Sequence, residues 1–213
     1  MNQALIDNIR HALQPIPGGG VETGDIQMNQ HLAAFFSAAR VPAAVLIPLV
    51  KREDGLHVML TVRPENMNQH AGQICFPGGK AEAADVTPAC TALRETEEET
   101  GLPRNRVEIL GYLPDYVTRT GYKVTPVVGL VHLPIELAAN PGEVAEIFEV
   151  PLDFFMEPAN CNIFELQWQD NTGRFYNFDC DGHKVWGATA GMLVILRNLL
   201  RPGAEPEAQL RFG

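Results

Sequence analysis

Four glutamates crowd into five residues near the middle of the chain, at Glu95, Glu97, Glu98 and Glu99, directly after Arg94. On a helix, Glu95, Glu98 and Glu99 share one face, and like charges at this spacing destabilise a helix by about 0.2–0.5 kcal/mol. Carboxylates near a helix C-terminus also oppose the helix dipole. A divalent cation offsets both costs, because Mg²⁺ binds one or two protein carboxylates and keeps positions open for water and substrate phosphates. The cluster therefore predicts a metal-dependent phosphate site, with Glu97 pointing elsewhere, to solvent.

A capped helix over residues 88–100 must position these carboxylates. Thr87 suits the N-cap, and Pro88 suits the first helical position, where the missing N–H is not needed. Gly101 suits the left-handed position that ends a helix, and Pro103 prevents its continuation. The helical period predicts a core-facing side opposite to the glutamates, formed by Ala89, Ala92, Leu93, Thr96 and Thr100.

A glycine pair precedes the helix, in the segment Phe76-Pro77-Gly78-Gly79-Lys80. Glycine lets the backbone turn tightly toward a site, and the carbonyl of Gly79 is a further hard oxygen ligand for the same cation. The alternative is a solvated, glutamate-rich surface, which is the usual reason for such a helix face. The glycine pair and the two helix caps favour the metal site.

The composition is that of one ordinary domain. The chain has 213 residues, and 26 acidic against 16 basic residues give a formal charge of −10. So negative a surface disfavours a nucleic-acid partner. The longest apolar segment, 41–50, is too short to span a membrane and contains two prolines. Four scattered cysteines indicate buried free thiols, and the N-terminal residues do not read as a signal peptide, so a cytoplasmic location is expected.

The order of the expected elements indicates a mixed α and β core. Helical extension 1–40 precedes the core at 41–200, and a mobile tail covers 201–213. Tight turns are expected at Asp54-Gly55 and Asp181-Gly182. Helices are expected at 1–14, 29–39, 88–100 and 188–200, and strands at 43–50, 56–62, 107–113, 124–132, 144–150, 163–168 and 174–179.

The segment from Gly79 to Leu102 resembles the Nudix box, in which a glycine and a glutamate precede the pattern R-E-U-x-E-E-x-G-U, where U is aliphatic. Here the pattern reads Arg94-Glu95-Thr96-Glu97-Glu98-Glu99-Thr100-Gly101-Leu102. Thr96 departs from the aliphatic position. One extra residue lies between Gly79 and Arg94, and Asp85 stands roughly where the first glutamate is expected. The last two features resemble the coenzyme A diphosphatase branch of the Nudix family.

That branch carries an upstream motif, L-L-T-x-R-S-x3-R-x3-G-x3-F-P-G-G. The chain matches its spacing throughout, but Pro64 replaces the serine and Asn68 replaces the second arginine. Both departures bear on the identity of the substrate. The resemblance covers about residues 41–200, and the matching stretch reads Met59-Leu60-Thr61-Val62-Arg63-Pro64, then Asn68, Gly72 and Phe76-Pro77-Gly78-Gly79.

The resemblance implies the Nudix fold, an α/β/α sandwich with a mixed β-sheet in the α+β class. It also implies hydrolysis of a nucleoside diphosphate derivative, and for this branch cleavage of coenzyme A or acyl-CoA to 3′,5′-ADP and (acyl-)4′-phosphopantetheine. The box assigns Glu95, Glu98 and Glu99 as ligands of Mg²⁺ or Mn²⁺.

Other roles follow from charge and position. We expect Arg94 to orient the glutamates through ion pairs, and the general base to be Glu98, Glu143 or Glu146. Candidate phosphate contacts are the cations Arg63, Lys80, Arg119 and Lys123, and Tyr122 is a candidate for stacking on a base. A surface charge kept for solubility is the alternative for each cation.

Two other functions remain open from the sequence. One is a Nudix diphosphatase for ADP-ribose or another nucleoside diphosphate derivative, favoured by Pro64 and Asn68. The other is a nucleotide-binding module without catalysis, which the three intact glutamates disfavour. Residues 1–40 are consistent with a dimerisation arm or a lid, so a homodimer is also left open.

Overall fold

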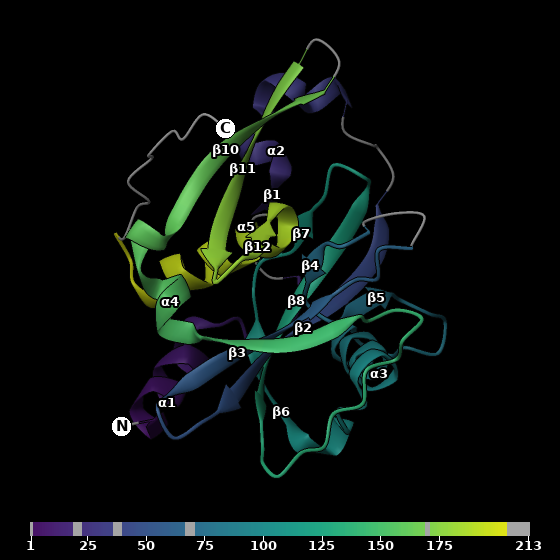
Figure 1. Ribbon diagram of the computed structural model, residues 1–213, viewed down its shortest axis with the longest axis vertical. Helices are drawn as coiled ribbons and strands as arrows, with labels where there is room; N and C mark the ends of the chain where they lie inside the picture. Colours follow the sequence, from purple (N-terminus) through teal and green to yellow (C-terminus); the bar gives the residue numbers. More distant parts are fainter. Residues whose placement is uncertain (1, 19–22, 36–39, 67–70, 169–170, 204–213) are drawn as a thin grey trace.

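The structure is a computed structural model that describes residues 2–18, 23–35, 40–66, 71–168 and 171–203. A long sheet forms its centre, and a shorter sheet stands beside it (Figure 1). The helical segments are α1 (Asn2–Ala12), α2 (Asp25–Met28), η1 (Gln30–Phe35), α3 (Pro88–Thr100), η2 (Arg104–Arg106), α4 (Leu152–Met156), η3 (Pro158–Asn160) and α5 (Gly187–Leu200). The strands are β1 (Thr23–Gly24), β2 (Val41–Lys51), β3 (Leu56–Val62), β4 (Ile74–Cys75), β5 (Gly78–Lys80), β6 (Val107–Tyr112), β7 (Tyr116–Val117), β8 (Tyr122–Val131), β9 (Glu146–Pro151), β10 (Cys161–Trp168), β11 (Asn171–Cys180) and β12 (His183–Trp186).

The central sheet is mixed. Within the described residues it has nine strands, with the order β1-β7-β8-β2-β3-β4, while β5 pairs with β2, β6 with β8 and β9 with β3. Strands β2 and β8 run parallel from the pair Val41–Tyr122 to the pair Val50–Val131, whereas β3, β5 and β6 join the sheet antiparallel. The smaller sheet is antiparallel, in the order β10-β11-β12.

Strand β2 is central despite its two prolines, which are usually confined to sheet edges. On the side away from β8, β2 pairs first with β5, over Ala43–Val45, and then with β3, over Leu49–Lys51. Pro48 lies between these two partners, so its missing N–H interrupts neither pairing. The arrangement leaves β5, with its glycine pair, directly beside the start of β2.

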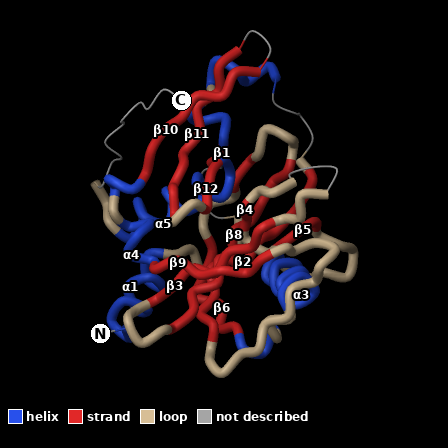
Figure 2. The backbone as a smooth tube through the Cα atoms, in the orientation of Figure 1, coloured by secondary structure: helices blue, strands red, loops and turns tan. Residues whose placement is uncertain are grey.

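Helices cover both faces of the central sheet (Figure 2). On one face, α3 contributes Ala92 to a core with Leu46, Met59 and Val127. On the other face, α1, α4 and α5 share a larger core with strands of both sheets, including Ile9, Phe155, Phe178 and Leu193. The expected α/β/α sandwich with a mixed sheet is therefore confirmed.

The N-terminal segment packs against this sandwich. Helix α1 buries Ile6 and Ile9 in the larger core, and Leu13, directly after the helix, joins the same core. The second expected helix, 29–39, was wrong in its bounds, because a short α-helix and a 3-10 helix occupy 25–35, and residues 36–39 lie outside the described part of the chain.

The other expected strands, turns and the last helix agree closely with the structure. The expected strands and the helix at 188–200 shift by only a few residues at their ends. Asp54-Gly55 connects β2 to β3, and Asp181-Gly182, with positive φ at both residues, connects β11 to β12. Cys161 and Cys180 are buried thiols, Cys75 and Cys90 are half-buried thiols, and no described helix is long and apolar enough to cross a membrane. The expected mobile tail lies outside the description from residue 204 onward.

Candidate active site

Helix α3 has the bounds and the caps that its sequence predicts. The Thr87 hydroxyl accepts a hydrogen bond from the backbone N–H of Cys90 at 3.3 Å, and Pro88 begins the helix. Gly101 takes the left-handed conformation, with φ +70°, and its N–H donates to the carbonyl of Glu97 at 2.9 Å. Both ends of the helix are fixed, which fixes the direction of the glutamates along its last two turns.

The sequence predicted that Glu99 lies on the glutamate side of α3, opposite to the core, and this was wrong. Glu99 is only 4% exposed and belongs to the buried face of α3, beside Ala92 and Thr96. Successive residues advance by 100°, so Glu99 lies about 20° from Ala92 around the helix. Glu95 is half-buried and Glu98 is exposed. The cluster thus spans the boundary between core and solvent.

The glycine pair of β5 lets the backbone approach α3 closely. A Cβ atom at Gly79 would lie 2.5 Å from the carboxyl group of Glu95, and one at Gly78, where φ is +154°, would overlap the backbone of β2 at Ala44. The N–H of Gly78 donates to Oε2 of Glu99 at 3.2 Å. The two glycines therefore bring the main chain against two of the three predicted ligands.

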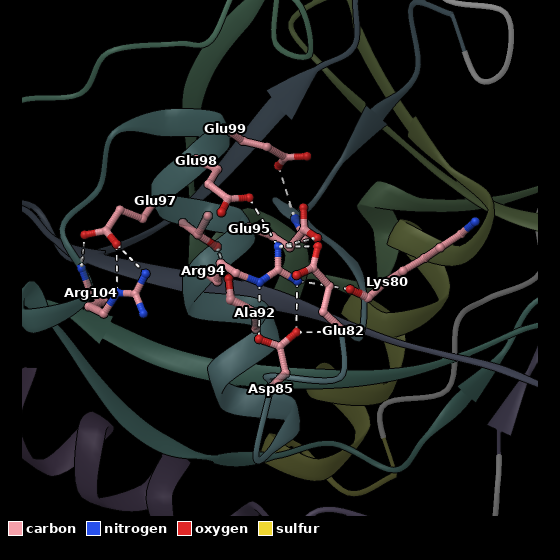
Figure 3. A network of polar contacts seen from close by, with 12 residues as sticks. Lys80, Glu82, Asp85, Ala92, Arg94, Glu95, Glu97, Glu98, Glu99 and Arg104 are labelled. Carbon is pink, nitrogen blue, oxygen red and sulfur yellow. Dashed lines mark hydrogen bonds and ion pairs between the residues drawn. The ribbon is translucent and has the colours of Figure 1, made fainter.

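Arg94 is the centre of the polar network on α3 (Figure 3). Its guanidinium donates to both carboxylate oxygens of Asp85, at 3.2 Å and 2.9 Å, and to the carbonyl of Lys80 at 3.1 Å. One of its terminal nitrogens also contacts Glu95 at 2.9 Å and Glu98 at 3.2 Å. Arg94 thus ties the loop after β5 to the helix, and its hydrogen bonds hold the pKa of Asp85 well below the usual range.

Glu99 is the electrostatically unusual member of the cluster. Burial, above all, raises its pKa to about 8, and the nearby charges of Glu143 and Glu95 act in the same direction. The hydrogen bond from Gly78 and the charge of Arg63 oppose this rise. Burial also raises the pKa of Glu95, against the effect of Arg94.

Of the two later glutamates, the structure brings one to the site. The backbone N–H groups of Ala138 and Asn140 donate to the carbonyls of Thr100 and Glu99, both at 2.8 Å. This connection holds the following turn against the end of α3, and Glu143 is close enough to influence the pKa of both Glu95 and Glu99. Glu146 contacts His183 instead, at 3.3 Å.

The carboxylate donors suit a hard divalent cation, and the buried carboxyl group of Glu99 forms no ion pair with the described side chains. In this part of the chain, no three His, Cys, Asp or Glu side chains already converge as a metal site, since Glu95 and Glu98 both turn toward Arg94. Joint coordination by all three glutamates therefore requires Glu95 and Glu98 to exchange contacts with Arg94 for contacts with the ion.

A cavity of about 690 Å³ opens beside the glycine pair, between the central sheet and the smaller sheet. This volume is typical of ligand sites. Four of the predicted substrate residues line it: Arg63, Lys80, Arg119 and Tyr122. The Lys80 ammonium lies 5.7 Å from the centre of the Tyr122 ring. Nε of Arg63 is buried without a hydrogen-bond partner among the described residues.

Lys123 does not join these residues. Neighbouring residues on a strand point to opposite faces, so Lys123 faces away from Tyr122 and lines a separate cavity of about 420 Å³. There its ammonium lies 3.0 Å from Asp115, which also accepts a hydrogen bond from Thr125. Asn68, where the upstream motif departs from its pattern, lies outside the described residues.

The sequence analysis missed the residues that complete the cavity from distant parts of the chain. Asp25 comes from the N-terminal segment, Phe175 and Trp186 from the smaller sheet, and Met192 from α5. Among them, only Asp25 is charged. Their proximity depends on how the smaller sheet and the N-terminal segment pack on the central sheet.

Comparison with known proteins identifies the family. The model of the NUDIX domain matches residues 40–167. A protein of Enterobacter sp. named "Uncharacterized Nudix hydrolase NudL" is 37% identical over 197 residues, which cover 87% of this chain and all of that protein. The protein of the same name from Yersinia pestis is 39% identical over 165 residues, covering 78% of this chain and 81% of that protein.

Solved structures match more loosely. An Ap4A hydrolase of C. elegans in a binary complex has 17% sequence identity and a TM-score of 0.46, covering 52% of this chain and 80% of that one. A MutT protein of Methanosarcina mazei has 24% identity and a TM-score of 0.43, covering 56% of this chain and 84% of that one.

The chain belongs to the Nudix family. It is accordingly a pyrophosphohydrolase that hydrolyses nucleoside diphosphate derivatives, and enzymes of this family generally use divalent metal ions.

Proposed function

We propose that the protein hydrolyses the diphosphate of coenzyme A or acyl-CoA, with Mg²⁺ or Mn²⁺, to 3′,5′-ADP and (acyl-)4′-phosphopantetheine. The observation that carries the proposal is the cavity beside Gly78 and Gly79. Through Gly78 and Gly79 its lining adjoins the carboxylates of Glu95 and Glu99, and aromatic and apolar residues of the smaller sheet and α5 form another wall. A diphosphate with a long, uncharged arm matches this division.

The proposed metal ligands are Glu95, Glu98 and Glu99, with the carbonyl of Gly79 as a further oxygen donor. When bound, a divalent cation neutralises charge on the nonbridging phosphate oxygens and lowers the pKa of bound water. Arg94 acts as a positioning residue in this proposal. Its contacts with Asp85 hold the guanidinium in place, so that the carboxylates of α3 start from a defined arrangement.

The proposed general base is Glu98 or Glu143. Glu98 is exposed on the rim of the cluster, and Glu143 lies close enough to act on the pKa of Glu95 and Glu99. Glu146, the third candidate, is already engaged with His183 on another strand. Either of the first two can accept the proton of an attacking water, provided that the water lies within hydrogen-bond reach.

Two cations at the end of the cavity beside the glycine pair, and a third farther along, support the binding of the substrate's phosphates. Lys80 follows the glycine pair directly, and Arg63 has an unpartnered, buried Nε among the described atoms. A buried donor without a partner costs free energy, so a phosphate oxygen that accepts from it contributes to binding. Arg119 lies farther along the same wall, with Tyr122 between the two ends as a candidate stacking surface.

The apolar wall supports an uncharged substrate arm. Phe175 and Trp186 meet edge to face, with ring centres 6.2 Å apart, and Met192 and the half-exposed Leu166 extend the same surface. Such a surface stabilises a pantetheine or acyl chain by removing it from water. ADP-ribose has no such arm. However, Pro64 is buried and replaces the serine of the upstream motif. This departure favours the alternative function, in which the substrate is ADP-ribose or another nucleoside diphosphate derivative.

Product analysis tests the proposal. The purified protein is incubated with coenzyme A, an acyl-CoA, ADP-ribose and NADH in separate reactions, each with Mg²⁺, with Mn²⁺ and with EDTA. We expect 3′,5′-ADP from coenzyme A at the highest kcat/KM, and no product in EDTA. Faster cleavage of ADP-ribose would reassign the substrate, while an inert protein would favour a binding module. We also propose that the protein forms a homodimer and lies in the cytoplasm. Sedimentation of the same sample tests the oligomeric state, and localisation in cells tests the compartment.

A further inference from the structure

The N-terminal segment closes one end of the cavity. Strand β1 pairs in parallel with β7, in the register Thr23–Tyr116 and Gly24–Val117. The N–H of Thr23 donates to the carbonyl of Asp115 at 2.8 Å. A Cβ atom at Gly24 would overlap the backbone of Val117, so only glycine permits this approach. The segment is therefore built into the edge of the central sheet.

The same segment is also joined to the smaller sheet. Asn29 is 1% exposed, and its side-chain oxygen accepts a hydrogen bond from the N–H of Arg174 at 2.6 Å. Its amide nitrogen donates to the carbonyls of Arg174 and Asp25, both at 2.9 Å. These three side-chain hydrogen bonds connect β11 with α2, the short helix that begins at Asp25. The position of Asp25 is fixed from both sheets.

Asp25 places a carboxylate on the wall of the cavity, at the end formed by residues 118–120. One of its oxygens accepts from the hydroxyl of Tyr116 at 2.7 Å, and the other accepts from the backbone N–H of Arg119 at 3.1 Å. A carboxylate has about four acceptor positions, so each oxygen retains capacity beyond these contacts. Burial raises the pKa of Asp25 although both hydrogen bonds lower it, which indicates that its desolvation is not fully compensated.

Helix α5 makes room for this arrangement. A Cβ atom at Gly191 would overlap the ring and hydroxyl of Tyr116, so the glycine allows the hydroxyl to reach Asp25. Tyr116 itself is 5% exposed and is not among the residues that line the cavity. It supports the carboxylate from behind.

We propose that Asp25 is a specificity-determining residue, which accepts a hydrogen bond from a hydroxyl or N–H group of the bound nucleotide derivative at the end of the cavity lined by Thr118 and Thr120. The charges of Asp25 and Arg119 offset each other at this end, whereas Arg63 and Lys80 attract a phosphate group at the other end. The charges of the wall therefore set the direction in which a substrate enters. This inference rests on the proposed binding of a diphosphate beside Gly78 and Gly79, and it deepens that proposal.

Two variants separate recognition of substrate from support of the fold. Asp25→Asn keeps a partner for both neighbours, because the amide oxygen can accept from Arg119 while the amide nitrogen donates to the Tyr116 oxygen. It removes the negative charge and one acceptor oxygen from the cavity wall. Tyr116→Phe removes the hydrogen bond behind the carboxylate and leaves the wall intact. If Asp25 only supports the fold, both variants should change KM to a similar extent. If Asp25 recognises the substrate, Asp25→Asn should raise KM and Tyr116→Phe should not.

The kinetics of the full-length protein with Mg²⁺ give the readout. We expect Asp25→Asn to raise KM about tenfold, as for the loss of a charged hydrogen bond, with kcat within about twofold. Tyr116→Phe should leave KM within about twofold. Equal KM values for Asp25→Asn and wild type would overturn the proposal, as would equal rises in both variants. If Asp25→Asn fails to fold while Tyr116→Phe folds, Asp25 is a residue of the fold and the proposal is likewise overturned.

The choice of ligand separates this inference from the proposed function. Both variants are compared on whichever of coenzyme A, ADP-ribose and NADH the wild type hydrolyses fastest. A raised KM for ADP-ribose, with no turnover of coenzyme A, would keep the role of Asp25 and reject the proposed substrate. If the wild type hydrolyses none, calorimetric dissociation constants for the same three ligands replace KM, and absence of binding would overturn both proposals.

Discussion

Replacing Glu99 by glutamine removes one buried titratable carboxyl group and changes little else. Glu99 is 4% exposed, and its hydrogen bond from the N–H of Gly78 can be kept by the amide oxygen. The pKa of Glu99 is raised to about 8 from an ordinary value of 4.5. The folded protein therefore retains a proton that the unfolded chain has released. As pH rises through this interval, the free energy of unfolding falls, and above about pH 8 it levels off.

The size of the effect follows from the same numbers. A pKa difference of about 3.5 corresponds to about 5 kcal/mol in full, of which about 2 kcal/mol is lost between pH 6 and pH 8. In a chain of 213 residues, 1 kcal/mol shifts the melting temperature by about 2–4 °C. In EDTA, the melting temperature of the wild type should fall by about 4–8 °C more than that of Glu99→Gln between pH 6 and pH 8. The variant should also melt above wild type at pH 8.

Thermal melts followed by circular dichroism measure this difference, with Glu97→Gln as a matched control on the same helix. Glu97 pairs with Arg104 at the surface, and this pairing lowers its pKa, so the control should not reproduce the gain at pH 8. Millimolar Mg²⁺ should raise the melting temperature of wild type and have less than half that effect on Glu99→Gln, which should also lose nearly all turnover. A variant that melts below wild type at pH 8, or that responds fully to Mg²⁺, would refute the reasoning.

Three further changes test the surroundings of the cluster. Arg94→Lys keeps the charge but loses the paired hydrogen bonds to Asp85, so kcat should fall about 10-fold to 100-fold in a steady-state assay while the far-UV spectrum is unchanged. Gly78→Ala should lower the melting temperature more than Gly79→Ala. The new Cβ atom at Gly78, where φ is positive, overlaps backbone atoms, whereas a Cβ atom at Gly79 meets only the end of the Glu95 side chain. Equal decreases in melting temperature would contradict this. Lys80→Ala should raise KM about tenfold and Lys123→Ala should not, since only Lys80 lines the cavity beside the glycine pair.

Local signals predicted the helix of the site well. The N-cap at Thr87 and the left-handed Gly101 set the bounds of α3, because caps act through hydrogen bonds within a few residues. Periodicity alone did not show that Glu99 is buried. The core side of α3 was inferred from its apolar residues alone. In the structure, strand β5 approaches the helix so closely that it also covers Glu99. The burial of Glu99 depends on a partner that lies about twenty residues earlier in the chain.

Long-range packing explains the other differences. The cavity depends on β11, β12 and α5, which come almost a hundred residues after the glycine pair, and on Asp25, which comes well before it. No local pattern encodes such proximity. The expected strand at 124–132 began two residues too late to include Tyr122 and Lys123. In the structure both belong to β8, where neighbouring side chains point to opposite faces, so they cannot line the same cavity.

The network around Arg94 gives a physical reason for the distribution of charge in the site. Arg94 already contacts Asp85, Glu95 and Glu98, so these carboxylates have a cationic partner before any ligand binds. Among the residues that the structure describes, Glu99 has only the N–H of Gly78 and the more distant charge of Arg63 to offset its burial. Glu99 would therefore contribute most to the binding free energy of an added cation. Glu95 and Glu98 would contribute only after their ion pairs with Arg94 are broken. On this basis Arg94→Lys, which weakens the competing contacts, should lower kcat through misplaced carboxylates without weakening the binding of Mg²⁺. Titration calorimetry with Mg²⁺ measures that affinity directly, and a loss of affinity comparable to that in Glu99→Gln would show that Arg94 supports the ligands instead of competing for them.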